Sequence, residues 1–229
     1  MLAVLVNAVT VIFGSILGLL LNKRLKEEYV KTVIACMGIC TMVIGITGAI
    51  GTSNIIIVIV CLVLGTILGE LLKLEQGMDR CGNCLKKKVP NGGGRFTEGF
   101  VTASLLFCVG SMSIVGSFEA GLQGNNSTIF AKSAMDGIMA VTLSATMGVG
   151  VIFSALTVIL YQGALTLLAG VIAPLLTDPI IKEMSAVGGV MLIATGMNII
   201  GLTKERIRVG NMLPALIFPA VWFAIAGLF

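Results

Sequence analysis

The sequence contains no histidine, and this absence removes a large group of chemistries. None of the 229 residues can supply an imidazole, which excludes His-metal sites, Ser-His or Cys-His catalysis and proton relays through histidine. No Walker loop or dinucleotide fingerprint is present, and the "NGGG" at 91–94 lacks the following GK[ST] of a phosphate-binding loop. The sequence therefore predicts no enzyme, no cofactor, no metal site and no ATP-driven pump.

Charged residues are also scarce. They make up 11% of the chain, whereas 57% of the residues are hydrophobic and the mean hydropathy is +1.07. Soluble domains carry about 25% charged residues. Because a bilayer tolerates only structures that satisfy their own backbone, we expect an all-α integral membrane protein. Apolar runs of about 20 residues predict about eight transmembrane helices, at 2–21, 30–50, 54–72, 99–118, 128–148, 157–176, 185–202 and 210–228.

Two of these segments need comment. The first run has no basic start and no small-residue cleavage pattern, so we interpret it as a retained span and not as a signal peptide. The apolar stretch 129–176 is too long for two straight crossings and too short for three. This length predicts a broken helix around 148–157, interrupted at Gly148 and Gly150 or at Ser154–Thr157.

The basic residues are confined to three connections. Four follow the first span, six lie in the longest polar segment (73–98) and three precede the last span, which accounts for 13 of 15. Flanking lysines and arginines stay on the cytoplasmic side. The pattern predicts a membrane protein with both termini outside and a cytoplasmic basic loop at 73–98. In this loop Cys81 and Cys84 could supply two zinc ligands. A structural zinc site needs four ligands, so two are too few unless subunits share the metal.

An internal repeat is visible in the sequence. "TVIFGSILGLLLNKRLKE" (10–27) aligns with "TLLAGVIAPLLTDPIIKE" (166–183), matching glycines, a Leu-Leu pair and a Lys-Glu pair. Five crossings separate the two copies, so they face opposite ways, as in many secondary transporters. We predict one transmembrane domain (1–229) with inverted copies at about 2–72 and 157–229, joined by linking helices at about 99–150.

Several segments carry a family resemblance. The stretch "FTEGFVTASLLFCVGSMSIVGSFEAGLQGNNSTIFAKSAMDG" (96–137) is the most distinctive, and 6–21, 150–170, 184–202 and 207–216 extend the likeness. With these motifs the chain resembles the bacterial membrane family catalogued as domain of unknown function 554. The resemblance implies a multi-pass inner-membrane protein, often described as a candidate transporter, and implies no substrate.

Lys132 and Asp136 are the most unusual residues of the chain. They lie four residues apart in an apolar setting, and hence on one face of a helix. A lone charge near the bilayer centre costs about 3 kcal/mol or more, and such residues usually face a partner or a watery cavity. We predict that Asp136 binds a proton, a sodium ion or a cationic group, with Lys132 as its counter-charge. A buried pair that only fixes packing, a Lys132 that reaches the outer surface, and a span at 137–157 that leaves both residues in a loop remain alternatives.

Uncharged polar residues and one further carboxylate complete the candidate site. Amides can hold an ion or a polar solute, although they also cross-link helices. Hydroxyls can line a path or bond back to their own helix. The candidate residues outside the charged pair are Glu119, Asn7, Gln162, Asn198, Asn211 and Ser104.

The hypothesis that joins these observations is a secondary, ion-coupled transporter of a small solute or ion. Its partners are then the lipid bilayer and a small solute or cation, with no nucleic acid, and a homo-oligomer is left open. Two other function classes remain open as well. A passive channel predicts a continuous water-filled path, and a non-transporting scaffold predicts polar groups that only hold helices together.

Overall fold

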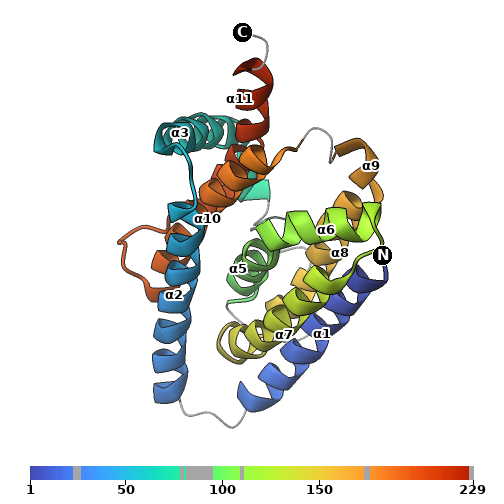
Figure 1. Ribbon diagram of the computed structural model, residues 1–229. Helices are drawn as coiled ribbons and strands as arrows, with labels where there is room; N and C mark the ends of the chain where they lie inside the picture. Colours follow the sequence, from blue (N-terminus) through green and yellow to red (C-terminus); the bar gives the residue numbers. More distant parts are fainter. Residues whose placement is uncertain (23–26, 78–79, 81–94, 109–110, 173–175, 227–229) are drawn as a thin grey trace.

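The chain is helical throughout the part that the structure describes. The computed structural model describes residues 1–22, 27–77, 80, 95–108, 111–172 and 176–226, and none of these forms a strand (Figure 1). Cys81, Cys84 and most of the basic loop lie outside the described residues. The all-helical fold class predicted from the sequence is confirmed.

Three long helices open the chain much as predicted. They are α1 (Leu2–Asn22), α2 (Glu27–Ile50) and α3 (Ile55–Leu72). Helix α3 begins at Asn54, whose side chain accepts a hydrogen bond from the Ile56 amide. Asparagine is a favoured residue at this position, because its carbonyl satisfies a donor of the first turn. The short segment between α2 and α3 therefore forms a tight turn with its own hydrogen bonds.

The span predicted at 99–118 is not one continuous helix. The segment forms two helices, α5 (Phe96–Cys108) and α6 (Ser111–Leu122), which meet at an angle of 59°. Hydropathy is continuous across both helices and gives no sign of the bend. The result is a broken span, or a re-entrant pair, in the middle of the chain.

The predicted break in the stretch 129–176 is present. Helix α7 (Ser127–Met147) ends at Gly148, and a short 3-10 helix, η1 (Val149–Phe153), leads into α8 (Ser154–Leu167) and a short α9 (Ala169–Ile172). Gly148 has φ +84° and ψ −160°, a conformation that is essentially restricted to glycine. This residue therefore allows the chain to turn between α7 and α8.

Helix α10 (Asp178–Ile200) begins seven residues before the predicted 185, so the expected loop at 177–183 is wrong. Pro179 lies in the first turn, where its missing N–H costs nothing, and Asp178 favours a helix start. The predicted last span is also interrupted. It consists of a 3-10 helix, η3 (Val209–Leu216), which contains Pro214, and of α11 (Phe218–Ala226).

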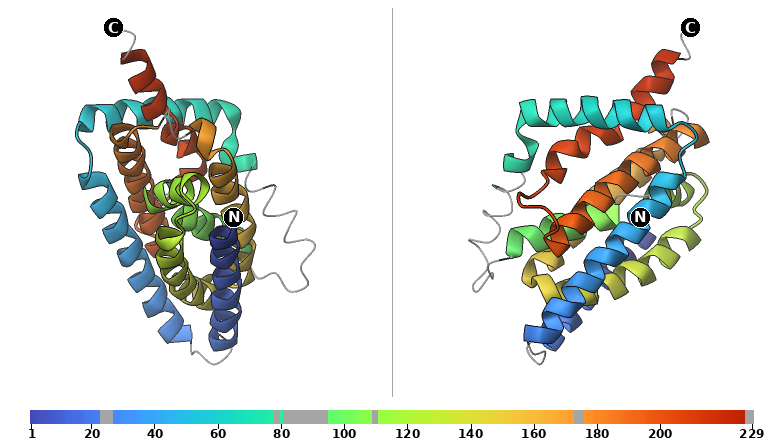
Figure 2. Two further views of the ribbon diagram at one scale, coloured as in Figure 1. Left: turned by 45° about the vertical axis from the view of Figure 1, so that its right-hand side comes forward. Right: turned by 90° about the vertical axis from the view of Figure 1, so that its left-hand side faces the viewer.

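The helices form two groups that are held by close backbone contacts. In the first group α1 packs along α7, and α5, α6 and α8 complete it; in the second α2 packs along α10, and α3 packs against η3 (Figures 1 and 2). A Cβ on Gly14 or Gly18 of α1 would overlap the carbonyl oxygen of Gly137 or Val141 on α7. Small residues allow membrane helices to approach this closely.

The outer faces of the helices are apolar. Phe13, Ile56, Leu71 and Leu160 are among many large hydrophobic side chains that are more than half exposed. Within the described part of the chain, five helices are long and apolar enough to cross a membrane, or six if the bent pair α5 and α6 counts as one span. Helix α7 is as long as α1 but is less apolar, since it carries Lys132 and Asp136. The structure thus supports a multi-pass helical membrane protein, without establishing eight crossings.

The α1–α7 contact gives a testable prediction. We expect Gly14→Ala to destabilise the protein by about 1–3 kcal/mol, because the added methyl must push α1 away from α7. The matched control is Gly170→Ala, since a Cβ at this position meets nothing within 4 Å. Thermal unfolding of the purified protein in detergent measures both effects. Equal melting temperatures for the two variants would contradict the close packing of α1 on α7.

Candidate functional site

The centre of the candidate site is an ion pair on α7. Lys132 Nζ lies 2.8 Å from both carboxylate oxygens of Asp136, and the two residues are 7% and 4% exposed. Both charges are therefore buried and paired within one helix. This result excludes an exposed loop around residues 132–136 and a Lys132 side chain that extends to the surface.

A chain of hydrogen bonds extends from the ion pair to three other helices. The side-chain amide of Asn7 on α1 donates to Asp136 Oδ2 (3.0 Å) and to Gln162 Oε1 on α8 (3.1 Å). Gln162 Nε2 in turn donates to Ser113 Oγ on α6 (3.0 Å). All of these residues are buried. The structure thus brings four of the predicted site residues together, namely Asp136, Lys132, Asn7 and Gln162.

One acceptor in this network has no partner. The side chain of Asn7 is fully buried, and its Oδ1 atom accepts no hydrogen bond. An unsatisfied buried polar atom costs about 1–3 kcal/mol. The amide cannot be turned around to relieve this cost, because its nitrogen already serves two acceptors. The network is therefore complete on the side of Asp136 and incomplete at Asn7.

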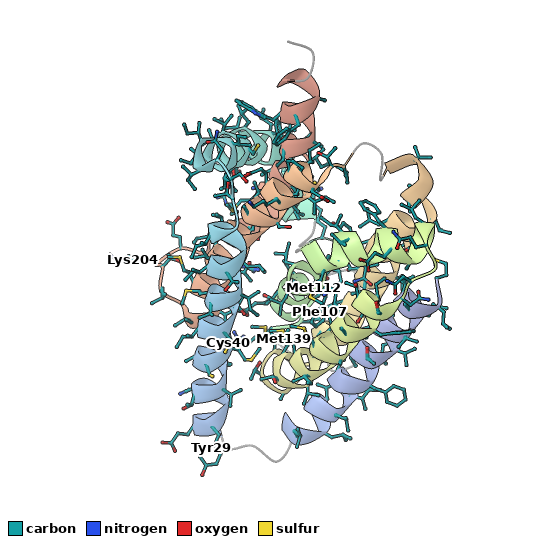
Figure 3. All side chains as sticks on the ribbon, viewed as in Figure 1. Tyr29, Cys40, Phe107, Met112, Met139 and Lys204 are labelled. Atoms are coloured by element: carbon teal, nitrogen blue, oxygen red, sulfur yellow. The ribbon has the colours of Figure 1, made fainter. Side chains whose placement is uncertain are left out.

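A cavity of about 420 Å³ borders the ion pair. Its walls come from both helix groups, with α2 and α10 on one side and α5, α6 and α7 on the other. Lys132, Asp136 and Ser113 line it together with mostly apolar side chains, which include Met112, Met135, Met139, Ile44 and Leu192. Figure 3 shows Met112 and Met139 directed into the space between α2 and α7.

A second cavity lies next to the first. Its volume is about 310 Å³, and Asp178 and Lys182 stand at its edge near the start of α10. The two cavities share Thr47 and Gly48 of α2 and Ser185 of α10. The cavity at the start of α10 therefore adjoins the cavity beside Asp136 along α2 and α10.

The other predicted site residues lie apart from the ion pair. Ser104 on α5 shares a hydrogen bond with Thr157 on α8 (3.0 Å), and Glu119 accepts one from Thr128 (2.6 Å) near the start of α7. Asn198 exchanges two hydrogen bonds with the Ile207 backbone, and Asn211 accepts one from the Glu75 amide. These side chains join neighbouring segments, and none of them lines the 420 Å³ cavity.

The sequence analysis missed a buried carboxylate, Glu183. It is 1% exposed and accepts hydrogen bonds from the Thr52 hydroxyl and the Ser53 amide (2.7 Å) in the turn between α2 and α3. The neighbouring Lys182 donates to Ser53 Oγ (2.9 Å). The Lys-Glu pair was visible in the repeat, but it was assigned to a loop. Among the described residues no three His, Cys, Asp or Glu side chains gather to hold a metal ion.

We expect Glu183→Gln to destabilise the protein by about 1–3 kcal/mol, because an amide offers one acceptor oxygen and leaves either the Thr52 hydroxyl or the Ser53 amide without a partner. Chemical or thermal unfolding in detergent measures the loss. Glu205→Gln, at an exposed position, is the control and should unfold like the unmodified protein. An unchanged stability for Glu183→Gln would show that the turn does not depend on this carboxylate.

Comparisons with known proteins agree with a membrane protein. The chain is 33% identical over 227 residues to the uncharacterized membrane protein YdfK of Bacillus subtilis (strain 168), covering 96% of this chain and 95% of that protein. It is 31% identical over 232 residues to the uncharacterized protein YqgA of Escherichia coli (strain K12), covering 96% and 97%. No solved structure matches the chain significantly. The profile of a family described as "Protein of unknown function (DUF554)" matches residues 2–224, and the chain therefore belongs to the DUF554 family.

Proposed function

We propose that this protein is a secondary transporter of a small solute or ion across the bacterial cytoplasmic membrane. The observation that supports this most is the buried Lys132–Asp136 pair, which borders a 420 Å³ cavity between two groups of helices. A pair that served only to hold helices together needs no open space beside it. Ionisable groups within membrane helices usually mark the path of a substrate or an ion.

In the proposed mechanism the two charges of the pair alternate between partners. With the site empty, Lys132 neutralises Asp136 through two contacts of 2.8 Å. A cationic group that reaches Asp136 from the cavity replaces Lys132 as its partner, and the ammonium of Lys132 must then pair with another group. When this ligand leaves, Lys132 returns and keeps the carboxylate from being an uncompensated charge, which costs about 3 kcal/mol or more in a membrane.

The directions of the helices support the predicted order of eight crossings. Helices α1 and α7 run parallel, since Gly14 and Gly18 lie beside Gly137 and Val141 in the same order. In the predicted order α1 is the first crossing and α7 is the fifth. Both therefore run from the outside to the cytoplasmic side when the N-terminus is outside. Helix α10 runs antiparallel to α2, as crossings seven and two require. The 3-10 helix η3 runs antiparallel to α3, as crossings eight and three require.

The packing also supports the inverted repeat. The alignment pairs α1 with α8, α2 with α10, and α3 with η3 and α11, and each helix of the first copy packs against its counterpart. Asn7 and Gln162, at similar places in the two copies, are hydrogen-bonded to each other. Such contacts arise when two copies surround a common axis. Rocking of one copy against the other would then open the cavity alternately to each side of the membrane.

One observation favours a different function. The hydrogen bonds from Asp136 through Asn7 and Gln162 to Ser113 join α1, α6, α7 and α8. A non-transporting membrane scaffold would need this network for stability alone. The scaffold hypothesis predicts that loss of the Asp136 charge lowers the melting temperature and that no solute flux exists to be lost.

The transport hypothesis predicts that Asp136→Asn loses flux even in protein that has kept its fold. The amide keeps the shape of the side chain and an acceptor for Asn7, but it cannot pair with a cation. Proteoliposomes that contain pyranine and carry an imposed potassium diffusion potential report proton movement when mixtures of amino acids, amines and organic acids are added. We expect Asp136→Asn to fall to the level of protein-free liposomes.

The matched control for this experiment is Glu70→Gln. Glu70 is an exposed carboxylate at the end of α3, in an ion pair of 3.1 Å with Arg208. It should transport like the unmodified protein. Helix content and elution volume test the folding of both variants. Normal flux in Asp136→Asn would disprove the assignment of this residue.

A further inference from the structure

The 420 Å³ cavity presents two opposite charges at one end and apolar walls elsewhere. Lys132 and Asp136 both line it, with the Ser113 hydroxyl beside them. The hydroxyls of Thr47 and Ser185, also in the lining, donate to the carbonyls of Val43 and Ile181 in their own helices. Polar recognition in the cavity is therefore concentrated at the ion pair.

The pair disfavours a ligand with a single charge. A cation that approaches Asp136 meets the ammonium group of Lys132, which lies 2.8 Å from the same carboxylate. An anion that approaches Lys132 likewise meets Asp136. Either ligand would leave one buried charge without a partner, and such a charge costs several kcal/mol. A neutral apolar solute would use neither charge.

A ligand that carries both charges avoids this cost. Its carboxylate can pair with Lys132 and its ammonium group with Asp136, so that one buried ion pair is exchanged for two and the net charge stays at zero. Asn7 continues to donate to Asp136 throughout the exchange. No bond is broken and no proton has to move.

The remaining walls fit an apolar side chain. Three methionines (Met112, Met135 and Met139) line the cavity together with Val43, Ile44, Leu106 and Leu192. Methionine side chains are flexible and adapt to apolar ligands of different shape. Cavities of about 300–1,000 Å³ commonly hold small molecules with a few fixed polar contacts.

From these observations we propose that the cavity binds a zwitterionic amino acid with an apolar side chain, its ammonium on Asp136 and its carboxylate on Lys132. This inference rests on the proposed transport function, because it names the solute class of the same site. It goes further in requiring that both charges of the ligand be recognised together.

A series of matched ligands tests the proposal on the unmodified full-length protein. Leucine and methionine have both charges and an apolar side chain. 3-Methylbutylamine lacks the carboxylate of leucine, 4-methylpentanoate lacks its ammonium group, and glycine lacks its side chain. We expect leucine or methionine to raise the melting temperature in detergent with increasing concentration, because a ligand that binds only the folded state stabilises it. The three analogues should require at least about tenfold higher concentrations for the same shift.

Two variants locate the binding. The double variant Lys132→Met with Asp136→Leu removes both charges together and leaves no buried lone charge. It should fold and lose the response to leucine. Glu70→Gln with Arg208→Gln removes an exposed pair outside the cavity and should keep the response. A third variant, Met112→Trp, fills the cavity without changing the pair and should weaken the response to leucine.

The outcomes separate this inference from the proposed function. Equal stabilisation by an amine, a carboxylate or glycine, or no stabilisation by any amino acid, overturns the ligand class. Flux driven by a ligand with one charge, without an effect of leucine, overturns the ligand class and leaves transport in place. Binding of leucine with no flux in proteoliposomes supports the ligand class and overturns transport.

Discussion

The arrangement around the cavity depends on keeping a carboxylate in an apolar helix bundle. Lys132, one turn before Asp136 on the same helix, neutralises its carboxylate. Asn7 on α1 donates a further hydrogen bond to it. Because the charge is balanced within α7, this helix can pack directly against α1 through Gly14 and Gly18. The neighbours α6 and α8 then have to supply only the uncharged groups that complete the network.

The second helix group is held in a different way. Helices α2 and α10 cross at Gly45 and Gly189, where backbone meets backbone, and Gly38 and Gly196 repeat the contact further along. The side chains of Met42, Ile193 and Ile200 pack against these glycines, so the crossing combines close backbone approach with interlocked side chains. Three small residues near this crossing, Thr47, Gly48 and Ser185, line both cavities.

The sequence was sufficient for the helical class, for the approximate positions of α1, α2, α3 and α7, and for the shared face of Lys132 and Asp136. It also singled out Asn7 and Gln162 as candidate site residues. Hydropathy could not reveal the 59° bend between α5 and α6, because both halves are equally apolar. It also hid the first turns of α10, where Asp178, Lys182 and Glu183 suggested a loop. Lys182 and Glu183 form hydrogen bonds with the distant turn at 52–53, which only the folded chain brings close.

Glu183 has a mechanical consequence for the second helix group. By holding Thr52 and Ser53, it fastens the α2–α3 turn to the base of α10, while α3 is already pressed against η3. A displacement of α10 must then carry α3 and η3 with it as one rigid block. Relative motion is left to the border with the block of α1, α5, α6, α7 and α8, which is where the 420 Å³ cavity lies.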